Sequence, residues 1–163
     1  MKIIITQWSL DAYLELKHNN VFTQAYYQVQ LRPDALLLAN YPNDPKFDNG
    51  KFWSPAKWNQ QIIPGGYKMK WHQVGNGCVQ LRLPVAILNN AYICQGYVKR
   101  DEKTEKRMLA KFKTHLQLLH DFLLGFHIAS GGVPDCVCLA QWAVRVLVDL
   151  AVSEVLHRIL RHE

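Results

Sequence analysis

The sequence predicts an α+β fold, in which an N-terminal strand and helices precede a three-stranded antiparallel meander with a basic face and C-terminal helices. Residues 67–98 alternate between apolar and polar side chains with a period of two, which is typical of strands with one buried face. The flanking segments place apolar residues three and four positions apart, as amphipathic helices do. At 163 residues the chain fits one compact domain, with room for an appendage.

The first forty or so residues predict a short strand followed by helical segments. Residues 3–5 are consecutive isoleucines, which favour a strand. Ser9 is a suitable N-cap for a helix over residues 10–18, where apolar side chains recur at helical spacing. The segment 23–40 predicts two further helical pieces. Pro33 begins the second of them, because a proline inside a helix loses a hydrogen bond and clashes with the preceding turn.

The segment 41–60 predicts a long ordered loop, because prolines and an Asn-Gly pair give it the chemistry of turns. Four of its aromatic side chains either stack on exposed bases of single-stranded RNA or anchor the loop to the core. The sequence leaves both interpretations open. These aromatic residues are Phe47, Phe52, Trp53 and Trp58.

Three strands are predicted after this loop, over residues 67–72, 79–83 and 91–98. The glycine-rich turn at 75–77 joins the first two as a hairpin, with apolar side chains on one face and polar side chains on the other. The meander therefore has one face that belongs to the core and one that is basic. The polar side chains of the hairpin are Lys68, Lys70, His72, Gln80 and Arg82.

A basic amphipathic helix is predicted next, over about residues 99–126. Its apolar side chains form one stripe. Lys103, Arg107 and Lys111 recur every four residues away from that stripe, so they are expected on the solvent side.

Glycines between residues 121 and 134 predict a break after this helix. The chain would thus divide into an α+β domain, residues 1–124, and an apolar helical extension, residues 125–163. A helix predicted over 139–160 is apolar on most of its circumference, so its own domain or a partner must cover it. Insertion into the core and self-association through this C-terminal helix are both open alternatives.

Charge is concentrated in one part of the chain. Ten of the nineteen Lys and Arg residues lie between positions 66 and 115, against three acidic residues there, so one patch accounts for the formal charge of +6. A positive field of this kind attracts a polyanion such as nucleic acid, or an anionic surface. The alternative is a solvated lysine-rich face without a partner.

Other features argue against metal sites and membrane insertion. The four cysteines form no paired CxxC clusters, so we expect neither a metal nor a cofactor. Arg145, Asp149 and Glu154 interrupt the apolar segment 137–156, so no membrane span is expected. Few cysteines and the lack of a signal-peptide pattern fit a cytoplasmic location.

Two stretches resemble the RelE/ParE superfamily of bacterial toxins, in particular its RelE-like, host-inhibition branch. They are GGYKMKWHQVGNGCVQLRL and AYICQGYVKRDEKTEKRMLAKFK. The resemblance covers about residues 60–117 and lies in the order of motifs: Tyr-Lys-x-Lys on one strand, Leu-Arg on the next, and Val-Lys-Arg leading into a helix. The apolar tail after residue 120 has no counterpart in that family.

The resemblance implies a compact RelE-like fold and metal-independent cleavage of messenger RNA, usually on the ribosome, with neutralisation by a cognate antitoxin protein. Attack of a 2′-hydroxyl on the adjacent phosphate builds negative charge, which fixed Lys and Arg groups stabilise without a metal. By position, the resemblance assigns these catalytic roles to Lys68, Lys70, Arg82, Lys99 and Arg100, and RNA contacts to the helix residues Lys103, Arg107 and Lys111.

No general base follows from the resemblance. His72 and Tyr97 are acid–base candidates by strand geometry alone, because histidine exchanges protons near neutral pH and tyrosine carries a hydroxyl. Each has a structural alternative: His72 as a surface imidazole, and Tyr97 as a packed ring.

Three other functions remain open from the sequence. A toxin of the gyrase-inhibiting branch would bind a protein target with the same fold and cleave no RNA. A non-catalytic nucleic-acid-binding module would use the basic sheet only to contact phosphates. A protein-interaction subunit would use the apolar tail as its functional surface, with the basic patch meeting an acidic partner.

Overall fold

A computed structural model describes residues 1–75 and 77–129. Helices surround a 6-stranded mixed sheet whose strands lie in the order β1-β5-β4-β3-β2, with β6 paired to β4. The predicted α+β class is therefore confirmed. The strands are β1 (Ile3–Ile5), β2 (Trp53–Trp58), β3 (Gln61–Val74), β4 (Val79–Ile87), β5 (Ala91–Ile93) and β6 (Tyr97–Val98).

The N-terminal strand and helix form as predicted, with a different cap. Strand β1 pairs in parallel with β5, and α1 (Gln7–His18) follows directly. Thr6, not Ser9, is the N-cap: its hydroxyl accepts a hydrogen bond from the backbone N–H of Ser9 at 3.3 Å. Both residue types suit this position. Thr6 fills it because its hydroxyl also donates to the carbonyl of Ile93, which ties the start of the helix to the sheet.

Residues 24–40 form a nearly continuous helical run whose geometry changes along its length. Short turns α2 (Gln24–Tyr26) and η1 (Tyr27–Leu31) precede α3 (Arg32–Leu36) and η2 (Leu37–Asn40). Pro33 lies in the first turn of α3, so the second helical piece begins at this proline as predicted.

The loop predicted over 41–60 is in part wrong. It contains a short helical turn, η3 (Pro45–Asp48), and the strand β2, which pairs with β3. The proline content hid this strand. Pro55 is tolerated because β2 is the edge strand of the sheet, where a missing backbone donor can face away from the ladder.

The single third strand predicted over 91–98 is also wrong. The structure divides this segment into β5 and β6, and both pair with β4 in antiparallel fashion. Strand β5 lies between β4 and β1, whereas β6 pairs with β4 nearer the start of that strand, at Leu81 and Arg82. The alternating sequence pattern is the same in both strands, so it does not reveal that residues 94–96 between them are irregular.

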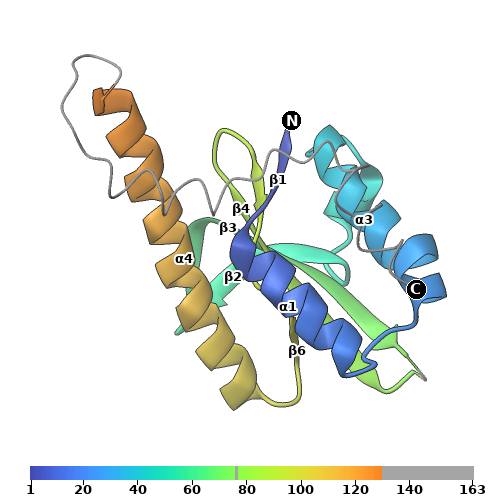
Figure 1. Cartoon of the computed structure of the whole chain (residues 1–163). Helices are drawn as coiled ribbons and strands as arrows, with labels where there is room; N and C mark the ends of the chain where they lie inside the picture. The colour runs from blue at the N-terminus through green and yellow to red at the C-terminus, as the bar shows by residue number, and fades with distance from the viewer. Residues whose placement is uncertain (76, 130–163) are drawn as a thin grey trace.

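Each face of the sheet has its own core. Met69, Trp71 and Val85 belong to the core beneath α1 and the helical run 24–40. The other face packs against α4 (Glu102–Ala129) through Ala86, Tyr92 and the helix residue Phe112. In Figure 1, α4 lies to the left of the strands and α3 to the right. The predicted basic face is therefore also the face that α4 partly covers.

The break predicted at 121–134 is wrong over its first part. Helix α4 continues through position 125 to Ala129 and so crosses the expected boundary between residues 124 and 125. A glycine inside a helix lowers stability without ending the helix. The rest of the predicted extension, including the helix over 139–160 and its possible self-association, lies outside the described residues.

The contact between α4 and β3 can be tested by adding one methyl group. A Cβ atom on Gly66 would lie 2.9 Å from Phe112 Cε1 and 3.1 Å from Ile63 Cγ2, both inside the core. We expect Gly66→Ala to lower the free energy of unfolding by about 1–3 kcal/mol in urea denaturation, because the packed core has no room for it. Gly50→Ala is the matched control, since no described atom lies within 4 Å of its added Cβ. Equal stability of the two variants would contradict this packing.

Candidate nucleic-acid interface

Four predicted cations come together on the sheet face that α4 partly covers. Lys70 and Arg82 are direct partners across β3 and β4, and Tyr97 of β6 pairs with Arg82 on its other side. Lys68 lies two residues before Lys70 on the same face of β3. The backbone N–H of Lys99, just after β6, donates to the carbonyl of Gln80 at 2.7 Å. We call Lys68, Lys70, Arg82 and Lys99 the basic cluster.

A buried carboxylate that the sequence interpretation missed holds two members of this cluster. Glu105 is 7% exposed; its carboxylate lies 2.7 Å from Lys68 Nζ and 2.5 Å from Lys99 Nζ. Glu102 also contacts Lys99 Nζ, at 2.7 Å, but its side chain is almost fully exposed. A signal was present in the sequence. Glu105 lies on the apolar stripe of α4, four residues before the buried Leu109, where a carboxylate needs a partner.

The ion pairs shift the pKa values of their members. Burial alone raises the pKa of Glu105, but hydrogen bonds from Lys68 and Lys99 outweigh it and bring the pKa below its usual value. Hydrogen bonds to Glu102 and Glu105 raise the pKa of Lys99. Glu105 and Lys99 are therefore both charged at neutral pH, and the network fixes the start of α4 on the sheet.

Lys70 has a different environment. Its ammonium group donates to the backbone carbonyl of Gly50. Partial burial lowers the pKa of Lys70, and the nearby positive charges of Lys68 and Arg82 lower it further. Burial is the larger cause of this shift, and the neighbouring positive charges, which would also stabilise a bound anion, are the smaller one.

Arg82 is fixed by neutral acceptors. It is 4% exposed, and its Nη1 donates to the carbonyls of Leu81 at 3.0 Å and Trp71 at 3.3 Å. Its Nη2 donates to Gln80 Oε1 at 2.8 Å. Within the described residues, no carboxylate is hydrogen-bonded to Arg82 or Lys70. The four cations of the cluster thus face two carboxylates, those of Glu102 and Glu105, which leaves a net positive charge.

The two acid–base candidates lie in contrasting surroundings. Tyr97 is 5% exposed, and its hydroxyl is buried with no hydrogen-bond partner among the described residues. Burial raises the pKa of Tyr97 strongly, so this hydroxyl can donate a hydrogen bond but is a poor base. His72 is exposed on β3, with Nε2 2.9 Å from the carbonyl of Lys51. In the neutral ring, that contact assigns the hydrogen to Nε2 and leaves Nδ1 as the proton acceptor.

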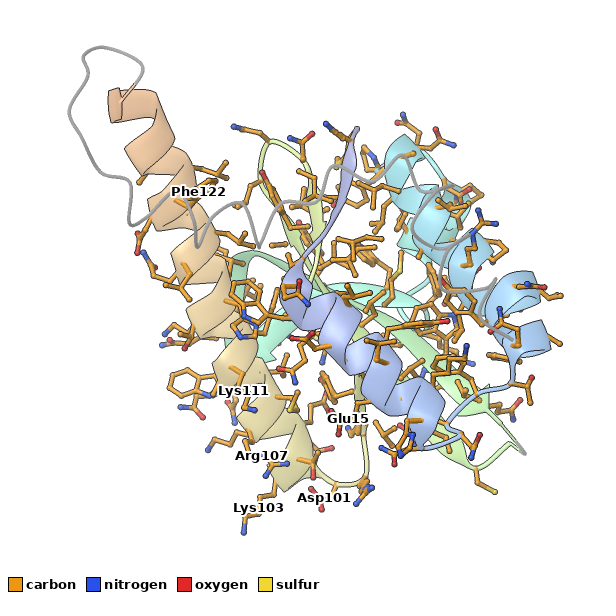
Figure 2. All side chains as sticks on the ribbon, viewed as in Figure 1. Glu15, Asp101, Lys103, Arg107, Lys111 and Phe122 are labelled. Carbon is orange, nitrogen blue, oxygen red and sulfur yellow. The ribbon has the colours of Figure 1, made fainter. Side chains whose placement is uncertain are left out.

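The remaining basic candidates are separate from the cluster. Arg100 is exposed between β6 and α4. Lys103, Arg107 and Lys111 are exposed and follow one another along the first half of α4 (Figure 2). The cluster meets α4 through the buried Glu105 instead. The structure therefore brings four of the five predicted catalytic residues together and places the helix cations on another side of α4.

Most of the aromatic residues in 41–60 belong to the core. Phe47, Phe52 and Trp53 are buried, and the rings of Phe47 and Trp53 meet edge to face with centroids 5.1 Å apart. Buried rings cannot stack on bases, so the interpretation that these three read RNA is wrong, and the anchoring interpretation is confirmed. Trp58 is half-buried, and Lys113 Nζ lies 4.7 Å from its ring centroid.

His115 joins α4 to α1. Its ring stacks on Trp8 with centroids 3.9 Å apart and an interplanar angle of 5°. Burial, with a smaller contribution from the charge of Lys111, lowers the pKa of His115 to about 4. The imidazole is therefore neutral at pH 7 and serves as a packing group in this contact.

Comparisons of the chain with protein-family models, curated proteins and solved structures gave no match. Among the described helices, none is both long and apolar enough to cross a membrane. Nor do three or more His, Cys, Asp or Glu side chains gather as potential metal ligands anywhere in the described ranges.

Glu105 provides a test of how the basic cluster is held. At pH 7 we expect Glu105→Gln to lower the free energy of unfolding by about 1.5–3 kcal/mol, because two partly buried lysines lose their carboxylate. The folded-state pKa of Glu105 is depressed, so its contribution is present above its unfolded-state pKa and is lost as pH falls through the folded value. Urea denaturation of wild type and variant should converge only when the pH falls below the depressed folded-state pKa of Glu105.

Glu102→Gln is the matched control for this experiment. Its carboxylate is exposed and pairs only with Lys99, so we expect a change within about 0.5 kcal/mol at pH 7. Equal losses for the two variants would show that Glu105 does not hold the cluster.

His115 predicts a second pH dependence. Its folded-state pKa of about 4 lies below its ordinary value of 6.5, so the neutral ring stabilises the fold fully above pH 6.5 and less as pH falls towards 4. His115→Phe keeps a ring against Trp8 and cannot be protonated. The stability of wild type relative to this variant should fall by about 2 kcal/mol between pH 7 and pH 4.5 in urea denaturation. His120→Phe, at an exposed position of α4, controls for a phenylalanine on this helix. A pH-independent difference for His115→Phe would contradict the buried neutral imidazole.

Proposed function

We propose that this protein is a toxin-like, metal-independent endoribonuclease that cleaves messenger RNA at its basic cluster. The observation that carries the proposal is the pairing of Lys70 and Arg82 across β3 and β4, in a cluster whose four cations face two carboxylates. This pair has the charge that a scissile phosphate requires. The resemblance of residues 60–117 to RelE-like toxins supports the same chemistry and adds its setting: the ribosome, the cytoplasm and a neutralising antitoxin.

The proposed reaction is an in-line attack of a 2′-hydroxyl on the adjacent phosphorus. The 2′-oxygen bonds to phosphorus, the bond from phosphorus to the 5′-oxygen breaks, and a 2′,3′-cyclic phosphate and a 5′-hydroxyl result. A base takes the 2′-hydroxyl proton, and an acid gives a proton to the leaving 5′-oxygen. Negative charge grows on the phosphoryl oxygens, where fixed cations stabilise it.

The residues of the cluster divide these roles. Arg82 cannot lose its proton under working conditions, and its guanidinium is held by three acceptors, so it suits the fixed charge beside the phosphate. Lys70 releases a proton at lower pH than an ordinary lysine, which suits it to proton transfer as well as charge stabilisation. His72 Nδ1 is the alternative proton acceptor from the same strand.

The other predicted residues have supporting roles. Glu105 holds Lys68 and Lys99 in place, so these two contribute positive charge at fixed positions. Tyr97 has a buried hydroxyl beside Arg82, suited to donate to a phosphate oxygen that enters the cluster. Lys103, Arg107 and Lys111 would contact the RNA backbone along α4, outside the reacting site.

A second candidate function is phosphate binding without cleavage. The ion pairs of Lys68 and Lys99 with Glu105 favour it, because they reduce the charge available to a transition state. Binding and cleavage differ in what a substitution changes. If the protein only binds phosphates, loss of a lysine would weaken RNA binding and reduce its salt dependence. If the protein cleaves RNA, the same loss would also slow bond breaking.

Cleavage of a defined RNA by purified protein tests the proposal. In the presence of EDTA, we expect the wild type to cut single-stranded RNA or ribosome-bound message, and Lys70→Ala to slow cutting by about 100-fold or more, as loss of one transition-state donor does. Lys17→Ala on α1 is the matched control. An oligonucleotide with a single 2′-deoxy nucleotide at the cut site should resist cleavage.

The outcomes separate the candidates. RNA binding that falls with Lys70→Ala, without cutting by any variant on or off the ribosome, would replace the proposal with the binding function. Growth arrest on induction, with neither new message ends nor RNA binding but with altered DNA supercoiling, would identify the gyrase-inhibiting alternative. If wild type and Lys70→Ala cut RNA at the same rate, the basic cluster would not be the site of cleavage.

A further inference from the structure

A second potential site lies on the other face of the sheet. A cavity of about 150 Å³ separates α1 from the helical run 27–36 and reaches down to strands β1, β3, β4 and β5. It is bordered by the sheet face opposite the basic cluster, since Trp71 and Leu81 alternate with Lys70 and Arg82 along their strands. The proposed RNA chemistry does not use this cavity.

The cavity is apolar and large enough for one ring. Leu31, Trp71 and Leu81 line it and are each no more than 6% exposed. A buried water needs two to four polar partners, and the walls of this cavity are mainly apolar. An engineered protein cavity of about 150 Å³ with similar lining stays dry and binds benzene. Size and lining therefore suit a small hydrophobic molecule better than water.

Tyr13 and Arg32 are two of the polar residues that line the cavity, and they give it a chemical preference. Tyr13 lines it, and the Tyr13 hydroxyl is buried with no hydrogen-bond partner among the described residues. A buried donor without an acceptor is unfavourable, so a ligand that brings an acceptor gains a hydrogen bond and relieves that state. Arg32 also lines the cavity and is exposed, which places a permanent positive charge at its rim.

We propose that this cavity binds a small hydrophobic carboxylate with about one ring of apolar volume. The apolar body packs against Leu31, Trp71 and Leu81. The carboxylate accepts a hydrogen bond from the Tyr13 hydroxyl, and the positive charge of Arg32 attracts it at the rim. Arg82 of the basic cluster also borders this cavity. The ligand contacts proposed for the cavity do not involve Arg82, so this inference does not rest on the RNA-cleaving function.

The test is calorimetric titration of the full-length protein with three probes of similar size: benzoate, toluene and benzylamine. We expect saturable binding of benzoate, weaker binding of toluene, and benzylamine at least ten-fold weaker than benzoate. Tyr13→Phe should weaken benzoate about ten-fold, the worth of one hydrogen bond, without lowering the thermal midpoint of the unliganded protein. If the Tyr13 hydroxyl only supported the fold, its removal would lower the thermal midpoint together with the benzoate affinity.

A substitution that fills the cavity tests whether benzoate binds there. Ala35 lines the cavity, so Ala35→Leu should abolish benzoate binding, whereas Ala25→Leu, at an exposed position of α2, should retain it. If Ala35→Leu fails to fold, methyl NMR shifts of Ile5 and Ile93 on benzoate addition give the location instead. No saturable benzoate binding to the wild type at millimolar concentration overturns the proposal, as does unchanged binding by a folded Ala35→Leu. Equal affinity for all three probes overturns the carboxylate preference.

Discussion

The contact on which the candidate site depends is the double ion pair of Glu105 with Lys68 and Lys99. It joins β3 to two parts of the chain that lie far from it in the sequence, the segment after β6 and the first turns of α4. A carboxylate this deeply buried is tolerated only when charged donors satisfy both its oxygens, and here each oxygen meets one lysine. Because the helix start is fixed in this way, the rest of α4 is positioned to bury Leu109, Phe112 and Leu116 on the sheet.

The same sheet face must accommodate both a core and a charged site, and it does so by dividing along its length. Where α4 crosses β3, the face presents Gly66 and Ile63, which leave room for the Phe112 ring. Two residues past Gly66 the side chains become basic, starting with Lys68. Glu105 lies at this border, where its charge meets the lysines and its helix neighbours meet the core. Lys70 and Arg82 lie beyond it, which explains why they have no carboxylate partner within the described residues.

Sequence patterns predicted the parts of this arrangement that depend on local periodicity. The period-two alternation of 67–83 identified the shared face of Lys68, Lys70 and Arg82, and the isoleucines at 3–5 identified β1. What they missed depends on contacts between distant segments. Strand β2 was hidden because an edge strand accepts Pro55. The division of 91–98 was hidden because β5 and β6 have the same alternation and differ only in what they pair with. Glu105 was missed although it lies on the predicted apolar stripe of its helix, because only the folded chain shows that Lys68 and Lys99 are its partners.

Trp71 gives the two faces of the sheet a physical connection. Its ring lines the apolar cavity, its indole N–H donates to the buried Asp34 at 2.8 Å, and its backbone carbonyl accepts from Arg82 on the opposite face. Asp34 is in turn bonded to Gln30 and Lys46, so the Trp71 ring is held by a polar network inside an otherwise apolar layer. A group that displaced this ring would have to move β3 or break that network. Since Lys70 precedes Trp71 directly and Arg82 binds its carbonyl, the geometry of the basic cluster depends on how firmly the opposite face is packed.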